Sequence, residues 1–261
     1  MILNCIALLC LCLAVAYIGG MVYAYLVADK MIFPYTGSSY ADSAELIKLK
    51  SSDGERIAAY HLPNNSSPDL LLYSHGNGED LGSILPVLET FQAKGLAVFA
   101  YDYPGYGQST GTPSEAGVYA AAEAAYKYAT ETLGYAPENI TLYGRSLGSG
   151  PSCWLAERYP VHGLILDGAF SSTFRVMTKV RLLPWDRFDN IARLPSIECP
   201  VLILHGVQDR TVPFAHALQN QKVIQSRVET LWSEDAGHND LIEQLGSAYW
   251  TTVLSFSGKT L

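Results

Sequence analysis

A serine, an aspartate and a histidine follow one another along this chain, each in a short glycine-containing segment. Ser146 lies in the segment 144–148, which reads Gly-Arg-Ser-Leu-Gly, and Asp209 and His238 come later in that order. A serine hydroxyl becomes a nucleophile when a histidine accepts its proton and an aspartate holds that histidine in the required tautomer. The chemistry that these three residues predict is acyl transfer, in which the serine attacks a carbonyl carbon.

The residues around Ser146 predict a strand, a tight turn and a helix. An apolar run at 140–143 precedes the turn, and small residues follow it where a helix would begin. Glycines two positions before and after the serine would permit a strained backbone, because a Cβ there would collide with the neighbouring strand or helix. A helix starting behind the serine would aim backbone N–H groups at a developing oxyanion, and we expect the N–H of Leu147 to be one donor.

A second donor is expected in the loop after the apolar strand 70–74. This loop reads His-Gly-Asn-Gly over 75–78, and its glycines would let the backbone turn so that the N–H of Asn77 points at the serine. His75 precedes the serine and lies in a tight turn, so we expect it to have a structural role.

Several aspartates compete for the role of acid beside His238. Asp209 follows a predicted buried strand, and the carboxyl ends of such strands are where catalytic groups of α/β sheets gather. Asp167 also ends a strand, while Asp235 and Asp240 flank the histidine in sequence. Asp209 is favoured because it alone combines a strand-end loop with the chain order serine, acid, base.

The segments that must position these residues alternate between strand and helix. Residues 46–60 predict a β-hairpin around Asp53-Gly54. Further strands are expected at 70–74, 96–101, 140–143, 163–167, 200–204 and 228–232, and helices at 82–94, 113–133, 149–159 and 212–225, with a closing helix to about 256. Apolar and aromatic residues between about 169 and 199 predict a small lid or pocket rim over the serine.

The first 30 residues predict a membrane anchor. Residues 2–28 contain no charged residue, and a helix over them would be about 40 Å long, enough to cross a hydrocarbon core of roughly 30 Å. A cleaved signal peptide and a buried core helix are the alternatives. Lys30 and Lys48 follow the span and no Lys or Arg precedes it, which favours a cytoplasmic remainder.

Composition narrows the function further. The chain has 261 residues and a formal net charge of −8, which argues against a nucleic-acid partner. Three of its five cysteines lie in the apolar N-terminal segment, so no disulfide framework or metal-binding spacing is present in the sequence. We expect no metal or organic cofactor.

Taken together, these motifs resemble the α/β-hydrolase superfamily over about residues 31–256. The resemblance is carried by the segments 75–78, 102–107, 144–148, 205–209 and 237–240. Within the superfamily the chain is similar to membrane-linked hydrolases related to protein depalmitoylases, monoacylglycerol lipases and lysophospholipid lipases, and to bacterial serine peptidase-like hydrolases. This resemblance implies an α/β-hydrolase fold with a mostly parallel eight-stranded sheet, in a domain at 31–261 behind an anchor at 1–30.

The same resemblance implies hydrolysis of a carboxylic ester or thioester by Ser146, His238 and Asp209, with Asn77 and Leu147 forming the oxyanion hole. The substrate would be a small acyl ester or thioester, of a lipid or of an acylated protein. An amide or peptide hydrolase of the same fold is one alternative, since the same three residues cleave both kinds of bond. A catalytically silent, membrane-tethered binding protein is another.

Overall fold

A single β-sheet organises the domain in the computed structural model, which describes residues 2–34, 37–65, 67–179 and 181–258. Within these residues eight strands pair in the order β1-β2-β4-β3-β5-β6-β7-β8. They are β1 (Ile47–Lys50), β2 (Arg56–Leu62), β3 (Leu70–Ser74), β4 (Ala97–Tyr101), β5 (Ile140–Arg145), β6 (Gly163–Asp167), β7 (Val201–Gly206) and β8 (Val228–Ser233). β2 runs antiparallel to both of its neighbours, and all the other pairs are parallel. The predicted fold class is therefore confirmed.

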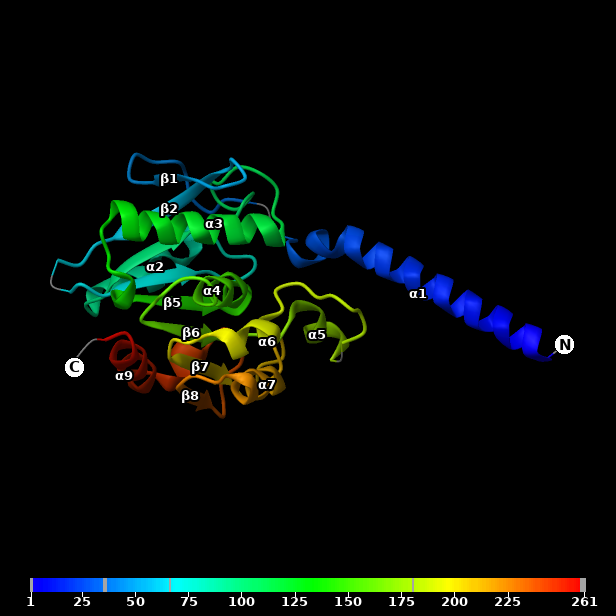
Figure 1. The fold of residues 1–261 in the computed structure, drawn as a ribbon. Coiled ribbons are helices and arrows are strands. Elements are labelled where there is room, and N and C mark those ends of the chain that lie inside the picture. Colours follow the sequence, from blue (N-terminus) through cyan, green and yellow to red (C-terminus); the bar gives the residue numbers. More distant parts are fainter. Residues whose placement is uncertain (1, 35–36, 66, 180, 259–261) are drawn as a thin grey trace.

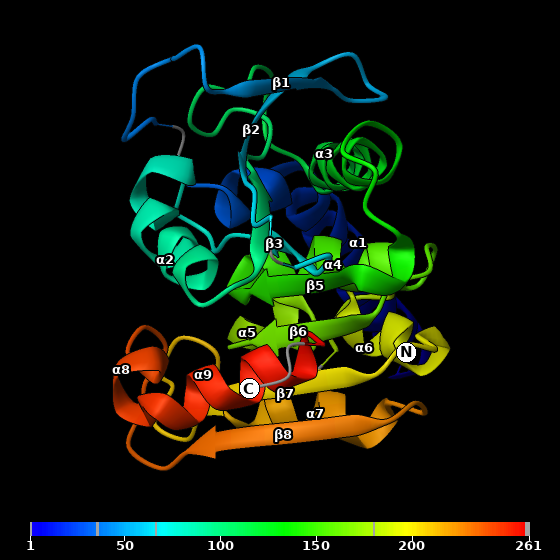
Figure 2. The same ribbon diagram turned by 90° about the vertical axis from the view of Figure 1, so that its left-hand side faces the viewer.

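Helices cover both faces of this sheet, which explains why the central strands are buried along their whole length. One face carries α2 (Leu81–Ala93), α8 (Leu241–Leu245) and α9 (Ser247–Phe256), and the other carries α3 (Glu115–Lys127), α4 (Ser149–Ala156) and α7 (Ala215–Val223) (Figure 2). Each face has its own cluster of buried apolar side chains. The register pairs Ser74 with Gly144 and Arg145 with Asp167, so the carboxyl ends of β3, β5 and β6 lie level at one edge.

Most predicted elements are present, and the differences have local causes. The hairpin forms as expected, with Lys50 opposite Arg56. The predicted helix 113–133 is α-helical to Lys127 and continues as a π-helix over Tyr128–Thr132. The prediction of one closing helix is wrong, because Gly246 has φ +52° and separates α8 from α9. Residues 169–199 carry two short helices, α5 (Thr173–Thr178) and α6 (Asn190–Arg193).

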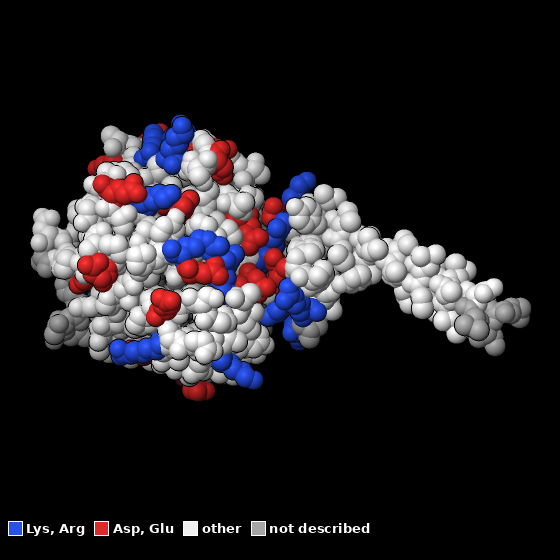
Figure 3. Space-filling view, in the orientation of Figure 1, with Lys and Arg blue, Asp and Glu red and all other residues white. Residues whose placement is uncertain are grey.

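The N-terminal helix α1 (Ile2–Ile32) extends away from the domain as a long rod (Figure 1). Its section Asn4–Ile32 is long and apolar enough to cross a membrane, as judged by length and composition. Large apolar side chains along it are exposed, among them Leu9 at 60% and Leu26 at 70%. Figure 3 shows charged side chains over the domain and at its junction with α1, whereas the rest of the described helix is uncharged in this view, which is the distribution that a membrane anchor or a signal sequence would have.

Candidate active site

Ser146 lies in the sharp turn between β5 and α4. Its φ is +49°, a left-handed conformation that is unfavourable for a residue with a Cβ. Both flanking glycines are required by close backbone approaches. A Cβ on Gly144 would lie 2.6 Å from the carbonyl oxygen of Gly148, and a Cβ on Gly148 would lie 2.0 Å from that of Ser74. The expected strained turn and the expected collisions are therefore present, and the turn lifts the hydroxyl to the carboxyl edge of the sheet.

A chain of hydrogen bonds connects Ser146 to a buried carboxylate. His238 Nε2 is 3.0 Å from Ser146 Oγ, and His238 Nδ1 is 2.7 Å from Asp209 Oδ2. The other carboxylate oxygen, Asp209 Oδ1, accepts backbone N–H bonds from Thr211 at 2.8 Å and Val212 at 2.7 Å. The loops after β7 and β8 thus bring together residues that are 92 and 29 positions apart in sequence.

The surroundings keep Asp209 ionised. Burial by itself would raise the pKa of this carboxyl, which is only 5% exposed. The hydrogen bond and charge of His238, together with the backbone N–H of Val212, outweigh burial and lower the pKa below its ordinary value. A carboxylate that stays charged can fix the histidine so that Nδ1 carries a proton and Nε2 faces the serine hydroxyl as an acceptor.

The competing aspartates make other contacts. Asp167 is buried and accepts a hydrogen bond from the hydroxyl of Tyr143 at 2.5 Å, and burial raises its pKa. Asp240 accepts the backbone N–H of Gly237 at 2.7 Å, which braces the loop that carries His238. Asp235 is exposed. Geometry therefore pairs His238 with Asp209.

The two expected oxyanion donors lie at the same cavity. Asn77 and Leu147 line, together with Ser146, a mainly apolar cavity of about 230 Å³. The side chain of Asn77 is held at both ends, because its Oδ1 accepts the hydroxyl of Tyr106 at 2.8 Å and its Nδ2 donates to the carbonyl of Ile32 at 2.5 Å. The loop is thereby fixed against the end of α1.

His75 contributes to the position of that loop and is fully buried. Its Nδ1 lies 2.8 Å from the carbonyl of Gly76, and its own carbonyl accepts the hydroxyl of Tyr103 at 2.5 Å. Asp102 lies 3.4 Å from its Nε2. These contacts point His75 into the protein interior, where it supports the loop of Asn77.

Arg145 is a residue that the sequence did not single out. Its guanidinium pairs with Glu79, and Nη2 donates to Asn239 Oδ1 at 2.8 Å. Glu79 in turn accepts the backbone N–H of Gly76 at 2.6 Å. Arg145 therefore links the serine turn to the loops of Asn77 and His238. Its position just before the serine was the available signal, but its partners are distant in sequence.

Ser146 lines two spaces of different character. The cavity of about 230 Å³ is lined mainly by apolar residues, among them side chains of α5 and the end of α1. The second space is a polar cleft of about 620 Å³, whose lining includes Glu79, Arg145, Thr211 and His238. No group of three or more metal-ligating side chains occurs in the described parts of the chain.

The fold and this arrangement define a class of protein, and comparisons with known proteins agree with it. The family model of the alpha/beta hydrolase fold matches residues 69–192. Human alpha/beta hydrolase domain-containing protein 17B is 39% identical over 207 residues, which cover 77% of this chain and 71% of that protein. The chain belongs to the α/β-hydrolase family.

Two further comparisons extend this relationship. Alpha/beta hydrolase domain-containing protein aho-3 of Caenorhabditis elegans is 34% identical over 235 residues, covering 88% of this chain and 70% of that protein. The esterase Pf2001 of Pyrococcus furiosus superimposes with a TM-score of 0.72 over 87% of this chain and 96% of its own, at 17% identity, and so shares the fold. The two relatives thus place the chain among alpha/beta hydrolase domain-containing proteins, and the likeness to Pf2001 shows the shared fold.

Proposed function

We propose that the protein is a membrane-anchored serine hydrolase that cleaves carboxylic esters or thioesters of acyl substrates. The observation that carries this proposal is the hydrogen-bond chain from Asp209 through His238 to Ser146, which ends beside an apolar cavity. Residues 1–30 would be the anchor, residues 31–261 the hydrolase domain, and residues 169–199 a small lid.

In the proposed reaction, Ser146 Oγ attacks the acyl carbonyl carbon while His238 Nε2 accepts the hydroxyl proton. The carbonyl oxygen of the resulting tetrahedral intermediate becomes an oxyanion, which the backbone N–H groups of Leu147 and Asn77 stabilise. His238 then gives the proton to the departing alcohol or thiol, leaving an acyl-enzyme. Water then attacks the acyl carbon while His238 Nε2 accepts its proton; the bond to Ser146 Oγ breaks, Oγ receives that proton from His238, and the carboxylic acid is released.

The two spaces beside Ser146 suit the two halves of such a substrate. The apolar cavity accommodates an acyl chain, whereas the polar cleft accommodates a leaving group and the hydrolytic water. The substrate would accordingly be an ester or thioester of an apolar acid, carried by a lipid or by an acylated protein.

Replacement of the nucleophile tests this function. Ser146→Ala should remove labelling by a fluorophosphonate probe and lower turnover of a p-nitrophenyl ester by a factor on the order of 10⁶. Ser152→Ala is the matched control, because it removes a buried serine hydroxyl from α4 that lines neither space. Equal labelling of wild type and Ser146→Ala would refute the assignment.

The bond that is cleaved requires a separate comparison. Among an ester, a thioester and an amide of the same acyl group, the amide should be hydrolysed most slowly, because amides are the least reactive of the three. An amide rate equal to the ester rate would instead indicate a peptidase-like hydrolase. A folded wild-type protein that the probe does not label would indicate a binding protein without hydrolytic activity.

A further inference from the structure

We propose that α1 is one wall of the acyl-binding site, and that the acyl chain of a membrane-resident substrate lies in the apolar cavity between α1 and residues 174–186. This inference deepens the proposed function and rests on it for the identity of the reacting bond. It assigns to the anchor helix a role in substrate recognition as well as in tethering.

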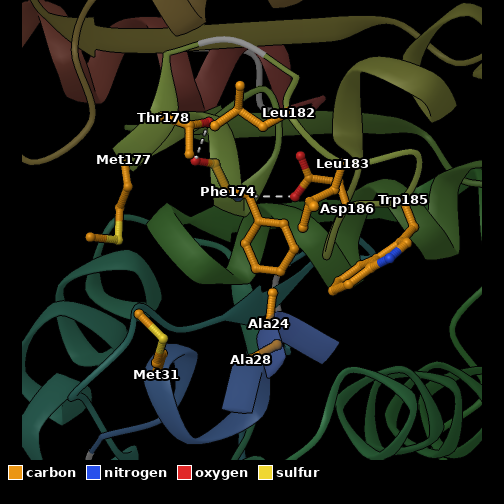
Figure 4. A pocket seen from close by; sticks show the side chains of 10 residues that line it. All are labelled: Ala24, Ala28, Met31, Phe174, Met177, Thr178, Leu182, Leu183, Trp185 and Asp186. Atoms are coloured by element: carbon orange, nitrogen blue, oxygen red, sulfur yellow. Dashed lines mark hydrogen bonds between the residues drawn. The ribbon is translucent and has the colours of Figure 1, made fainter. Parts of the chain in front are cut away.

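The cavity has a volume of about 320 Å³ and lies at the base of α1 (Figure 4). Ala24 and Ala28 line it from α1, and Phe174, Leu183 and Trp185 line it from the lid segment. This size falls at the lower end of the roughly 300–1,000 Å³ typical of ligand pockets. Small alanine side chains on the helix leave the space that larger residues would fill.

The two polar residues of its lining direct their polar groups to the protein. Thr178 Oγ1 donates to the carbonyl of Phe174 at 3.0 Å, as Figure 4 shows. The carboxylate of Asp186 accepts the backbone N–H of Phe174 at 2.9 Å and the hydroxyl of Ser172 at 2.7 Å. Because these groups are already paired, the cavity presents an apolar surface, which suits a hydrocarbon chain and not a polar ligand.

This cavity adjoins the one that contains Ser146. Met31, Phe174 and Met177 line both spaces. An acyl chain whose carbonyl carbon lies at Ser146 can therefore continue past these three side chains into the space beside α1. Met and Phe side chains suit such a junction, since methionine in particular adapts its shape to the ligand.

Several contacts hold α1 against the lid, so that this wall is a defined part of the site. The hydroxyl of Tyr17 donates to the carbonyl of Leu182 at 2.9 Å, and the rings of Tyr25 and Trp185 pack edge to face with centroids 5.6 Å apart. Arg187 Nε lies 3.6 Å from Asp29 Oδ1. The tether from Asn77 Nδ2 to the carbonyl of Ile32 joins the same helix end to the expected oxyanion loop.

The surface around the base of α1 suits contact with a bilayer. Met31, Met177 and Leu182 are 61%, 76% and 59% exposed there. Lys30 and Lys179 are exposed beside them, and cationic side chains near a membrane surface are attracted to anionic lipid headgroups. An acyl chain can thus leave the bilayer next to α1 and enter the cavity without crossing water.

Filling the cavity from the helix side tests the proposal in the full-length chain in lipid nanodiscs. Ala24→Phe should lower the ratio of kcat/KM for a sixteen-carbon to a four-carbon p-nitrophenyl ester at least tenfold, because each buried methylene contributes about fourfold. Leu183→Phe fills the same space from the lid and should act alike. Ala16→Phe, at an exposed position of α1 that lines neither cavity, should keep the wild-type ratio.

The same variants should lower the rate on an S-palmitoyl peptide and on 1-palmitoylglycerol, since both carry the same chain. The substrate that the wild-type protein hydrolyses faster, the peptide or the glycerol ester, identifies the source of the acyl group. An unchanged chain-length ratio in both filled variants, or an equal change in Ala16→Phe, would overturn the proposal.

A binding measurement keeps this test separate from catalysis. In the Ser146→Ala background, dibromostearic acid should quench the fluorescence of Trp185, which lines the cavity. Subtracting the fluorescence of a Trp185→Phe variant leaves the contribution of Trp185 alone. Adding Ala24→Phe should abolish the quenching. Quenching that persists would show that the bromines act from the bilayer, and would overturn the proposal even if hydrolysis is observed. Loss of quenching on filling would support it even if wild type hydrolyses no ester.

Discussion

Replacing Asp209 with asparagine changes one atom of the hydrogen-bond chain and reverses its direction. Asp209 Oδ1 accepts two backbone N–H bonds, from Thr211 and Val212. An asparagine must place its oxygen at the position of Oδ1, because an NH₂ group at that position would face these two N–H donors. Its NH₂ would then point at His238 Nδ1, which would have to accept a hydrogen bond. The proton would move to Nε2, the atom that must accept the proton of Ser146.

The magnitude follows from this wrong tautomer. The side chain keeps its size and the two backbone bonds, so the fold should persist while turnover falls by about 10⁴, equivalent to about 5.4 kcal/mol in the activation barrier. The assay is steady-state hydrolysis of a p-nitrophenyl ester by the full-length chain, together with the rate of fluorophosphonate labelling. Far-ultraviolet circular dichroism would check that the variant is folded.

Asp167→Asn is the matched control for this experiment. Asp167 also ends a strand and is buried, but it accepts a hydrogen bond from the hydroxyl of Tyr143. Asparagine can accept the same bond, so we expect less than a tenfold change in turnover. Full activity of Asp209→Asn together with an inactive Asp167→Asn would refute the reasoning and move the acid role to Asp167.

Two further predictions concern stability. Gly148→Ala should lower the free energy of unfolding by about 3 kcal/mol in chemical denaturation, because the new methyl would lie 2.0 Å from the carbonyl oxygen of Ser74; an unchanged midpoint would contradict the close approach. Asp209 has a lowered pKa in the folded protein, so its ionised form contributes stability above the ordinary carboxyl pKa of about 3.9, and this is lost as pH falls through the lower folded value. The difference in unfolding free energy between wild type and Asp209→Asn should therefore shrink as the pH falls below about 4, and a difference that grows over that range would oppose this sign.

Local sequence patterns determined much of the fold. Continuous apolar runs such as 70–74 and 163–167 predicted buried parallel strands, and they occupy the centre of the sheet. The glycines around Ser146 predicted a strained turn, because only residues without a Cβ permit backbones to approach so closely. These features depend on a few neighbouring residues and can therefore be predicted from the sequence alone.

Tertiary structure decided what depends on residues far apart in the chain. The loops after β7 and β8 place Asp209, and no other of the competing aspartates, against His238. Asp167 instead contacts Tyr143, and the sequence alone does not reveal this difference. The packing of Ala24 and Ala28 opposite Leu183 and Trp185 likewise has no sequence pattern, since it joins the first helix to a lid more than 150 positions later. Such cavities arise only where distant side chains leave space between them, and folding alone determines where that occurs.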